Sequence, residues 1–137
     1  MLNREIFVND PVSNRLANNG VAQVKDDVSK GALDTLEYEL RTFVCDGAYE
    51  KGLDKILSNY LSAFETNNEQ PGVWISGFFG SGKSHLAKML RTLWTNQKLN
   101  NGSDARSIAD LPENISRQLI KLSSIGAANG GLYAASG

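Results

Sequence analysis

Several residue types are scarce in this sequence, and each scarcity excludes a class of protein. The chain of 137 residues has a single cysteine, Cys45, so no disulfide can form within it and a reducing compartment is expected. No stretch approaches the roughly 18 apolar residues of a membrane-spanning helix, and the first residues lack the apolar core of a secretory signal. We therefore expect a cytoplasmic, soluble protein that has no membrane contact.

An excess of charge of one sign is also lacking. The sequence has 14 basic and 15 acidic side chains, which give a formal net charge of −1. Such a balance provides no general electrostatic attraction for nucleic acid or anionic lipid, so direct contact with nucleic acid is not indicated. Hydrophobic residues, in contrast, make up 41% of the sequence, which is enough for the core of one domain.

The amino-terminal half contains patterns for short strands and then for two helices. Residues 6–8 and 21–24 are apolar and β-prone, and each lies next to a turn signal. Apolar residues then recur at three- and four-residue steps over 32–45 and again over 53–64, which predicts two amphipathic helices. The short link between them suggests an antiparallel pair. Cys45, at the end of the first stripe, is expected to be a small buried residue rather than a nucleophile.

A short buried strand is expected over residues 73–76. Its apolar run, which includes Trp74, follows a polar loop that ends in Pro71 and Gly72. We place the side chain of Trp74 in the core.

Two helices are predicted beyond this strand. The first is expected over 83–94, with Lys88 and Arg91 on its solvated face. The second is predicted to begin close to Asp110, a cap candidate that is followed by a proline and an acidic residue. The inward-facing residues of the first helix are expected to be Leu86, Met89, Leu90 and Leu93.

The segment GFFGSGKS, residues 77–84, carries the most specific signal in the chain. It matches the phosphate-loop pattern G-x-x-x-x-G-K-[ST] at Gly77, Gly82, Lys83 and Ser84. Glycines allow the backbone to curl so that consecutive N–H groups point inward, and the N-terminus of the following helix adds to the anion site. The sequence therefore predicts a nucleotide-binding site.

The positions of this loop have distinct expected roles. Lys83 is the expected catalytic residue, because its ammonium group can reach the β- and γ-phosphate oxygens. The hydroxyl of Ser84 is placed to ligate Mg²⁺, so ATP and Mg²⁺ are the expected cofactors. The full set of expected nucleotide-binding residues is Gly77, Phe78, Phe79, Gly80, Ser81, Gly82, Lys83 and Ser84.

Three aromatic residues in and beside the loop are less typical of phosphate loops. Phe78 and Phe79 occupy positions where many such loops have small residues or proline. We expect at least one of them to pack against protein outside the loop, either the helical pair or a partner subunit, and so to link nucleotide state to assembly. His85, in the first helical turn, is expected to be a packing or surface residue, with direct contact to phosphate as the alternative.

The sequence lacks a recognisable second part of a hydrolytic site. Hydrolysis normally requires an acidic residue at the end of a second strand, which holds Mg²⁺, and a group that orients the attacking water. After Ser84 the nearest candidate is Asp110, which only two apolar residues precede. Two explanations stay open. The chain is the amino-terminal part of a longer ATPase, cut before its NTPase domain is complete, or it is a degenerate binder that never hydrolyses.

Three stretches of the sequence together resemble a known family. They are REIFVNDPVSNRLANNGVAQVKD, ILSNYLSAF and GVWISGFFGSGKSHLAKML, and they are similar to the start of the large P-loop ATPases of bacteriophage-exclusion (BREX) defence systems, the BrxC/PglY family. The resemblance covers most of residues 4–94, and the doubled phenylalanine in the loop is its most specific feature. It implies a cytoplasmic bacterial ATPase, several times longer than this chain, which acts with other defence proteins against phage. By position, Gly77 through Ser84 would be its ATP-binding loop.

These patterns together predict an α/β fold. Residues 1–70 would form an amino-terminal lead-in of short strands and two helices, and residues 71–137 the first part of a P-loop NTPase (AAA+-like) domain. The predicted function is ATP binding in the amino-terminal part of a BREX ATPase, with little or no turnover by this chain alone. The expected partners are the nucleotide and either a second copy of the protein or other phage-defence proteins.

Two alternative functions stay open. The first is a nucleotide-gated interaction module without hydrolysis, in which bound ATP orders a surface. The second, ranked last, is a small kinase that uses the same loop. A kinase requires lid arginines after the core, and residues 96–137 contain only Arg106 and Arg117.

Overall fold

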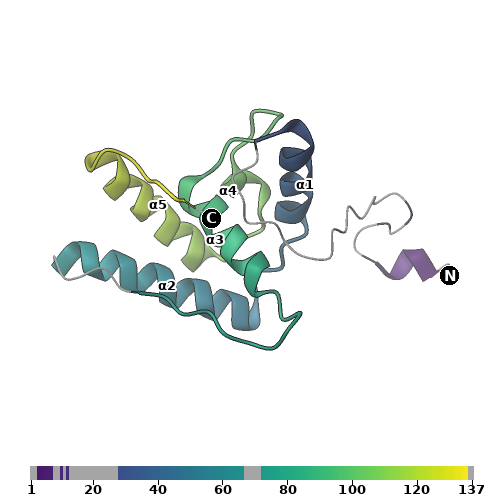
Figure 1. Ribbon diagram of the computed structural model, residues 1–137, viewed down its shortest axis with the longest axis horizontal. Coiled ribbons are helices and arrows are strands. Elements are labelled where there is room, and N and C mark those ends of the chain that lie inside the picture. Colours follow the sequence, from purple (N-terminus) through teal and green to yellow (C-terminus); the bar gives the residue numbers. More distant parts are fainter. Residues whose placement is uncertain (1–2, 8–9, 11, 13–27, 67–71, 136–137) are drawn as a thin grey trace.

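Helices form almost all of the regular structure in the part of the chain that is described. The computed structural model describes residues 3–7, 10, 12, 28–66 and 72–135 (Figure 1). In these ranges, no helix combines the length and the apolarity needed to cross a membrane. The elements are the 3₁₀ helix η1 (Asn3–Ile6) and the α-helices α1 (Lys30–Arg41), α2 (Gly47–Thr66), α3 (Lys83–Thr95), α4 (Ala105–Ile108) and α5 (Glu113–Ala128).

The predicted α/β fold class is wrong for the part of the chain that the structure describes. A P-loop NTPase core requires a parallel sheet, and the described residues form no sheet. Their β-type pairing is one isolated antiparallel bridge between Lys98 and Asp104. The strand expected over 73–76 is likewise not formed, and Trp74, expected in the core, is 90% exposed. A strand is stable only where a neighbouring strand receives its backbone hydrogen bonds, and the neighbours here are helices.

The first of the two amino-terminal strands, predicted over 6–8, is not formed where the structure describes it. Ile6, where the first β-prone run begins, ends the 3₁₀ helix η1, and its side chain is exposed. Val8 and residues 21–24 lie outside the described residues, so the rest of that prediction has no structural counterpart to compare.

The two amphipathic helices predicted in the amino-terminal half are present, with shifted ends. α1 begins after Ser29, whose hydroxyl accepts a hydrogen bond from the Ala32 N–H at 3.4 Å. It ends at Arg41, so Phe43 and Cys45 of the predicted first helix lie in the linker, where both are nevertheless buried. α2 begins at Gly47, six residues before the apolar stripe predicted over 53–64.

α2 packs most extensively against α5, and not as an antiparallel partner of α1. Asp54, early in α2, accepts hydrogen bonds from Asn114 at 3.2 Å and Gln118 at 2.7 Å, near the start of α5. Glu65, at the end of α2, pairs with Lys121, which lies further along α5. The two helices therefore run in the same direction, side by side (Figure 1). The predicted antiparallel pair is wrong, because α1 packs on α4 and is paired with α3 through Glu39 and Lys88, while α2 packs on α5.

One hydrophobic core joins the helices. The inward face predicted for α3 is confirmed, since Leu86, Met89 and Leu93 are buried and Leu90 is partly buried against them. The start of α5 differs from the prediction, because Pro112 rather than Asp110 occupies its N-cap position. The buried members of the core are Leu36, Leu40, Phe43, Cys45, Leu53, Leu57, Leu61, Leu86, Met89, Leu93, Leu99, Ala105, Ile115, Leu119 and Leu122.

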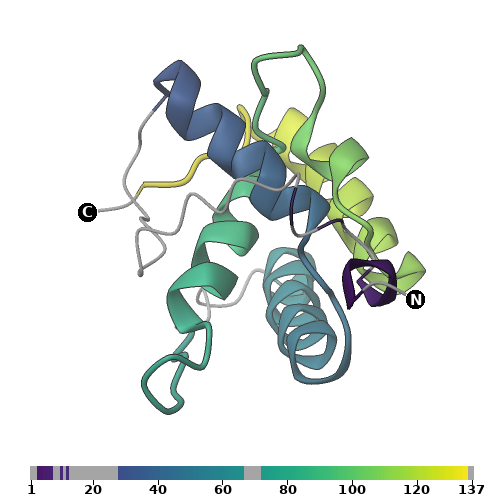
Figure 2. The same cartoon turned by 90° about the vertical axis from the view of Figure 1, so that its right-hand side faces the viewer.

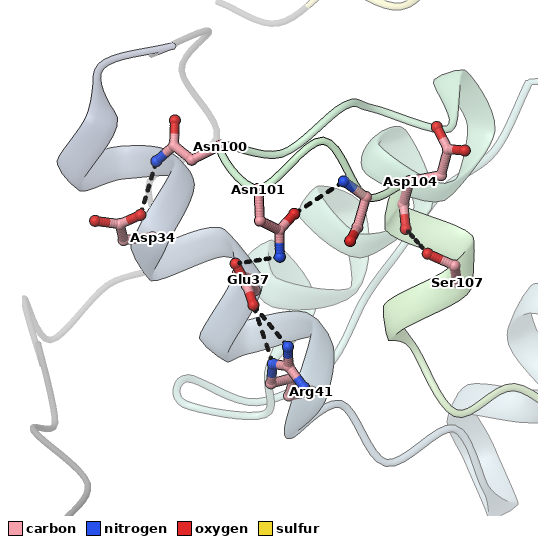
Figure 3. Close-up of polar contacts among 8 residues, drawn as sticks. Asp34, Glu37, Arg41, Asn100, Asn101, Asp104 and Ser107 are labelled. Atoms are coloured by element: carbon pink, nitrogen blue, oxygen red, sulfur yellow. Dashed lines mark hydrogen bonds and ion pairs between the residues drawn. The ribbon is translucent and has the colours of Figure 1, made fainter.

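The polar loop after α3 folds back onto α1 (Figure 3). The Asn100 side chain donates to Asp34 at 2.7 Å and to the Lys30 carbonyl at 2.9 Å. Next to it, the Asn101 side chain donates to Glu37 at 3.2 Å. These hydrogen bonds connect α1 to the segment that follows α3. They therefore fix α1 relative to α3, whose other end carries residues 77–84.

A charged pair links α1 and α3 directly. Lys88, expected on the solvated face of α3, forms an ion pair with Glu39 of α1, and the two side chains are only 14% and 19% exposed. Arg91, predicted on the same face, is half-buried. The solvated-face prediction is wrong because α1 covers this side of α3, which the sequence around residue 88 does not reveal.

Candidate functional site

The predicted phosphate loop, residues 77–84, is an irregular turn that leads directly into α3 and projects at one end of the molecule (Figure 2). The Ser81 N–H donates to the Phe78 carbonyl at 3.2 Å and closes a turn. Gly80 and Gly82 have φ angles of +77° and +79°, in the left-handed region that favours glycine. The loop is therefore curled although no strand precedes it.

The side chain of Lys83 folds back over this turn. Its Nζ donates to the Gly77 carbonyl at 3.0 Å and to the Phe78 carbonyl at 2.7 Å. A third, longer hydrogen bond of 3.4 Å reaches the Ser81 hydroxyl. All three acceptors are uncharged, so none of them balances the charge of the ammonium group. The charge is therefore placed beside the N-terminus of α3, where an anion would meet both.

Two glycines of the motif lie close to other side chains, and one of them, Gly82, also has a left-handed backbone. A Cβ atom on Gly77 would lie 2.7 Å from the Ser81 hydroxyl oxygen. A Cβ atom on Gly82 would lie 2.0 Å from the phenol oxygen of Tyr49, which belongs to the first turn of α2. The sequence pattern predicts the glycines, but not the contact with Tyr49.

The N-terminus of α3 completes the candidate anion site. Gly82 is its N-cap, and the Gly82 carbonyl accepts the first helical hydrogen bond, from the Leu86 N–H at 2.9 Å. The N–H groups of the first turn have no partner within a helix, and the helix dipole adds positive potential there. Ser84, the predicted Mg²⁺ ligand, lies in this turn and is exposed.

His85 has the packing role that the sequence predicts. Its ring meets Phe43 edge-to-face, with the ring centroids 5.8 Å apart. Burial is the main cause that lowers the pKa of His85. Lys88 acts in the same direction, and Glu39 opposes both. The imidazole is therefore favoured in its neutral form, which suits packing better than binding phosphate.

The two phenylalanines of the loop do not pack on the helical pair. Phe78 is 91% exposed and Phe79 is fully exposed, at 102%. The expectation that the pair at 32–64 covers one of them is therefore wrong, because α1 and α2 direct their apolar faces into the common core. Packing against a partner subunit, the other option, stays a prediction.

The described part of the chain offers few side chains that could bind a metal ion together. No group of three or more His, Cys, Asp or Glu side chains there is arranged to hold a metal ion. Asp110, the nearest acidic candidate, is exposed and lies in the short segment between α4 and α5.

Arg106 has a structural role. Its guanidinium donates to the carbonyls of Leu93 at 2.6 Å, Trp94 at 2.9 Å and Leu119 at 2.8 Å. Burial is the main cause that lowers its pKa, which Asp104 opposes. An arginine held this way is not available as a kinase lid residue, so the kinase alternative loses one of its two candidates.

Cys45 is buried, as expected. Burial raises the pKa of its thiol, and the nearby carboxylates of Glu50 and Asp46 raise it further. Since the thiolate is the nucleophilic form, this environment disfavours a catalytic role.

No protein-family model matches this sequence, and no solved structure matches the chain. The candidate site is therefore judged on its own geometry.

Proposed function

We propose that residues 77–84 bind the phosphates of ATP together with Mg²⁺. The observation that carries this proposal is the position of Lys83, whose ammonium group is held in the turn by two backbone carbonyls at 3.0 and 2.7 Å. A bound phosphate offers this lysine charged oxygens in place of neutral ones, and such charge-assisted hydrogen bonds are about twice as strong.

The surrounding groups fit a triphosphate. The free N–H groups at the start of α3 and the left-handed glycines Gly80 and Gly82 provide neutral donors beside the lysine. Ser84 supplies one hydroxyl ligand for Mg²⁺. When bound, Mg²⁺ neutralises part of the phosphate charge, and its remaining ligands would come from phosphate oxygens and water.

The wider identity rests on the resemblance of residues 4–94. On that basis the chain is the ATP-binding amino-terminal part of a BREX-type ATPase, in which ATP binding and hydrolysis drive a conformational or assembly change. The partners would be a second copy or other phage-defence proteins.

A binding measurement with matched lysine variants tests the site. At 100 times Kd, Mg·ATP should add about 2.7 kcal/mol to the free energy of unfolding of the wild-type chain. Lys83→Ala should lose most of this gain. Lys55→Ala, which removes an exposed lysine from α2, should keep it. Equal stabilisation of both variants and the wild type would show that the loop is not the nucleotide site.

A nucleotide-gated interaction module without hydrolysis is the second candidate. The exposure of Phe78 and Phe79 favours it, because two apolar rings at the mouth of the loop suit a contact whose formation depends on the bound nucleotide. Neither candidate expects turnover by this chain alone, so ATP turnover by a longer form of the protein is the measurement that separates them.

A further inference from the structure

Tyr49 contacts the candidate loop from a distant part of the chain. It lies in the first turn of α2, and its phenol hydroxyl donates to the Ser81 carbonyl at 3.3 Å. The two residues are 32 positions apart in the sequence. This is a hydrogen bond from another helix to the backbone of the loop.

Aromatic packing holds the Tyr49 ring in place. Tyr49 meets Phe43 edge-to-face, with centroids 5.9 Å apart and an interplanar angle of 70°. Phe43 is buried in the core and also meets His85 of α3 edge-to-face, with centroids 5.8 Å apart and an interplanar angle of 63°. The phenol therefore approaches the loop from a ring cluster that is anchored to both the α1–α2 linker and α3.

The hydrogen bond orients one particular peptide group. The described chain contains no cis peptide bond, and in a trans peptide the C=O and N–H groups point in opposite directions. With the Ser81 carbonyl turned toward Tyr49, the N–H of Gly82 points away from α2. Gly82 adopts the left-handed conformation, with φ of +79°, that allows this arrangement just before α3 begins.

We propose that Tyr49 is a positioning residue of the phosphate loop, which fixes the Ser81–Gly82 peptide so that the Gly82 N–H is presented to the anion. The inference rests on the proposed function, since it assigns the residue that orders that same site. It also explains why position 82 must be glycine in this chain, because a Cβ atom there would lie 2.0 Å from the phenol oxygen.

The first test measures Mg·ATP affinity by calorimetry, at a temperature where every variant is folded. Tyr49→Phe removes only the hydroxyl and should weaken binding about twofold to tenfold, the range for loss of one hydrogen bond. Tyr60→Phe is the matched control. Tyr60 lies in the same helix, and its ring packs on Trp94, away from the loop, with centroids 5.2 Å apart. The Tyr60→Phe variant should therefore bind Mg·ATP with the affinity of the wild type.

The second test needs no ligand. In the apo chain, Tyr49→Phe should shift the amide NMR signals of Gly82 and Lys83, whereas Tyr60→Phe should not. A double-mutant cycle adds a rescue. Gly82→Ala should be less disruptive in the Tyr49→Phe background, where the atom 2.0 Å from the new Cβ is gone, although the strain of φ +79° remains.

These outcomes separate the two proposals. If the wild type binds Mg·ATP, Lys83→Ala does not, and Tyr49→Phe binds like the wild type, the positioning role is wrong and the proposed function stands. The positioning role is also wrong if Tyr49→Phe only lowers the melting temperature and leaves the Mg·ATP affinity and the Gly82 amide signal unchanged. If the wild type binds no Mg·ATP, the proposed function fails and the anion-presenting role fails with it. The NMR test then decides only whether Tyr49 orders the loop.

Discussion

The guanidinium of Arg106 donates a hydrogen bond of 2.6 Å to the hydroxyl of Ser123, and so joins α4 to α5. The same guanidinium reaches the carbonyls of Leu93 and Trp94 in the last turn of α3. Carbonyls in a last helical turn have no i+4 partner within the helix. The Leu93 carbonyl also accepts from the Asn96 N–H at 3.3 Å, so the guanidinium is a second donor there and a donor to the neighbouring Trp94 carbonyl.

Arg106→Ala should therefore destabilise the fold strongly. Losing a half-buried charged donor that makes four hydrogen bonds should cost roughly 2–4 kcal/mol in the free energy of unfolding, measured with urea. Arg117→Ala is the control, because its ion pair with Glu113 is long, at 3.7 Å, and largely exposed. It should change stability by less than about 0.5 kcal/mol. Similar losses for both variants would contradict the structural role of Arg106.

The stability of the fold should fall in mild acid, partly because of His85. Burial lowers the pKa of His85 below its ordinary value of 6.5, so the unfolded chain binds the proton more readily than the folded chain. The resulting stabilisation is present above pH 6.5 and is lost as the pH falls below that value. His85→Asn should make the free energy of unfolding less dependent on pH between about 7.5 and 5.5. An equal or steeper dependence in the variant would show that groups other than His85 govern this range.

The chain by itself should hydrolyse ATP no faster than its Lys83→Ala variant. The loop supplies a lysine and a serine hydroxyl, but the described residues hold no acidic cluster that could bind a metal, and turnover needs an acid and a water-orienting group. The measurement is phosphate release by the purified chain at saturating Mg·ATP. Clear release that disappears in Lys83→Ala would mean that this chain contains a hydrolytic site.

Replacing Phe78 and Phe79 together with alanine should affect association more than nucleotide binding. Both rings are exposed, so the fold should lose less than about 0.5 kcal/mol. If a partner buries one ring, its loss should weaken nucleotide-dependent association about tenfold or more. Sedimentation velocity with and without Mg·ATP measures association, and calorimetry measures affinity. A collapse of ATP affinity with unchanged association at saturating ATP would assign the rings to the pocket.

Features that depend on neighbouring residues could be predicted from the sequence. The three- and four-residue spacing of apolar side chains identified α1, α2 and α3, because the helix period places such residues on one face whatever the rest of the fold is. The glycines of the loop and Lys83 were found in the same way. Their left-handed angles and the folded-back lysine are properties of about eight consecutive residues.

Features that depend on distant parts of the chain were decided only by the tertiary structure. The run at 73–76 was apolar enough for a strand, but the described residues offer no neighbouring strand to pair with it, and Trp74 is left in solvent. Lys88 is mostly buried because α1 places Glu39 against it. Tyr49 reaches Ser81 across 32 residues, a contact that no local pattern encodes. Strand pairing, ion pairing and this hydrogen bond each need a partner brought from elsewhere, and only packing of the helices determines which partner arrives.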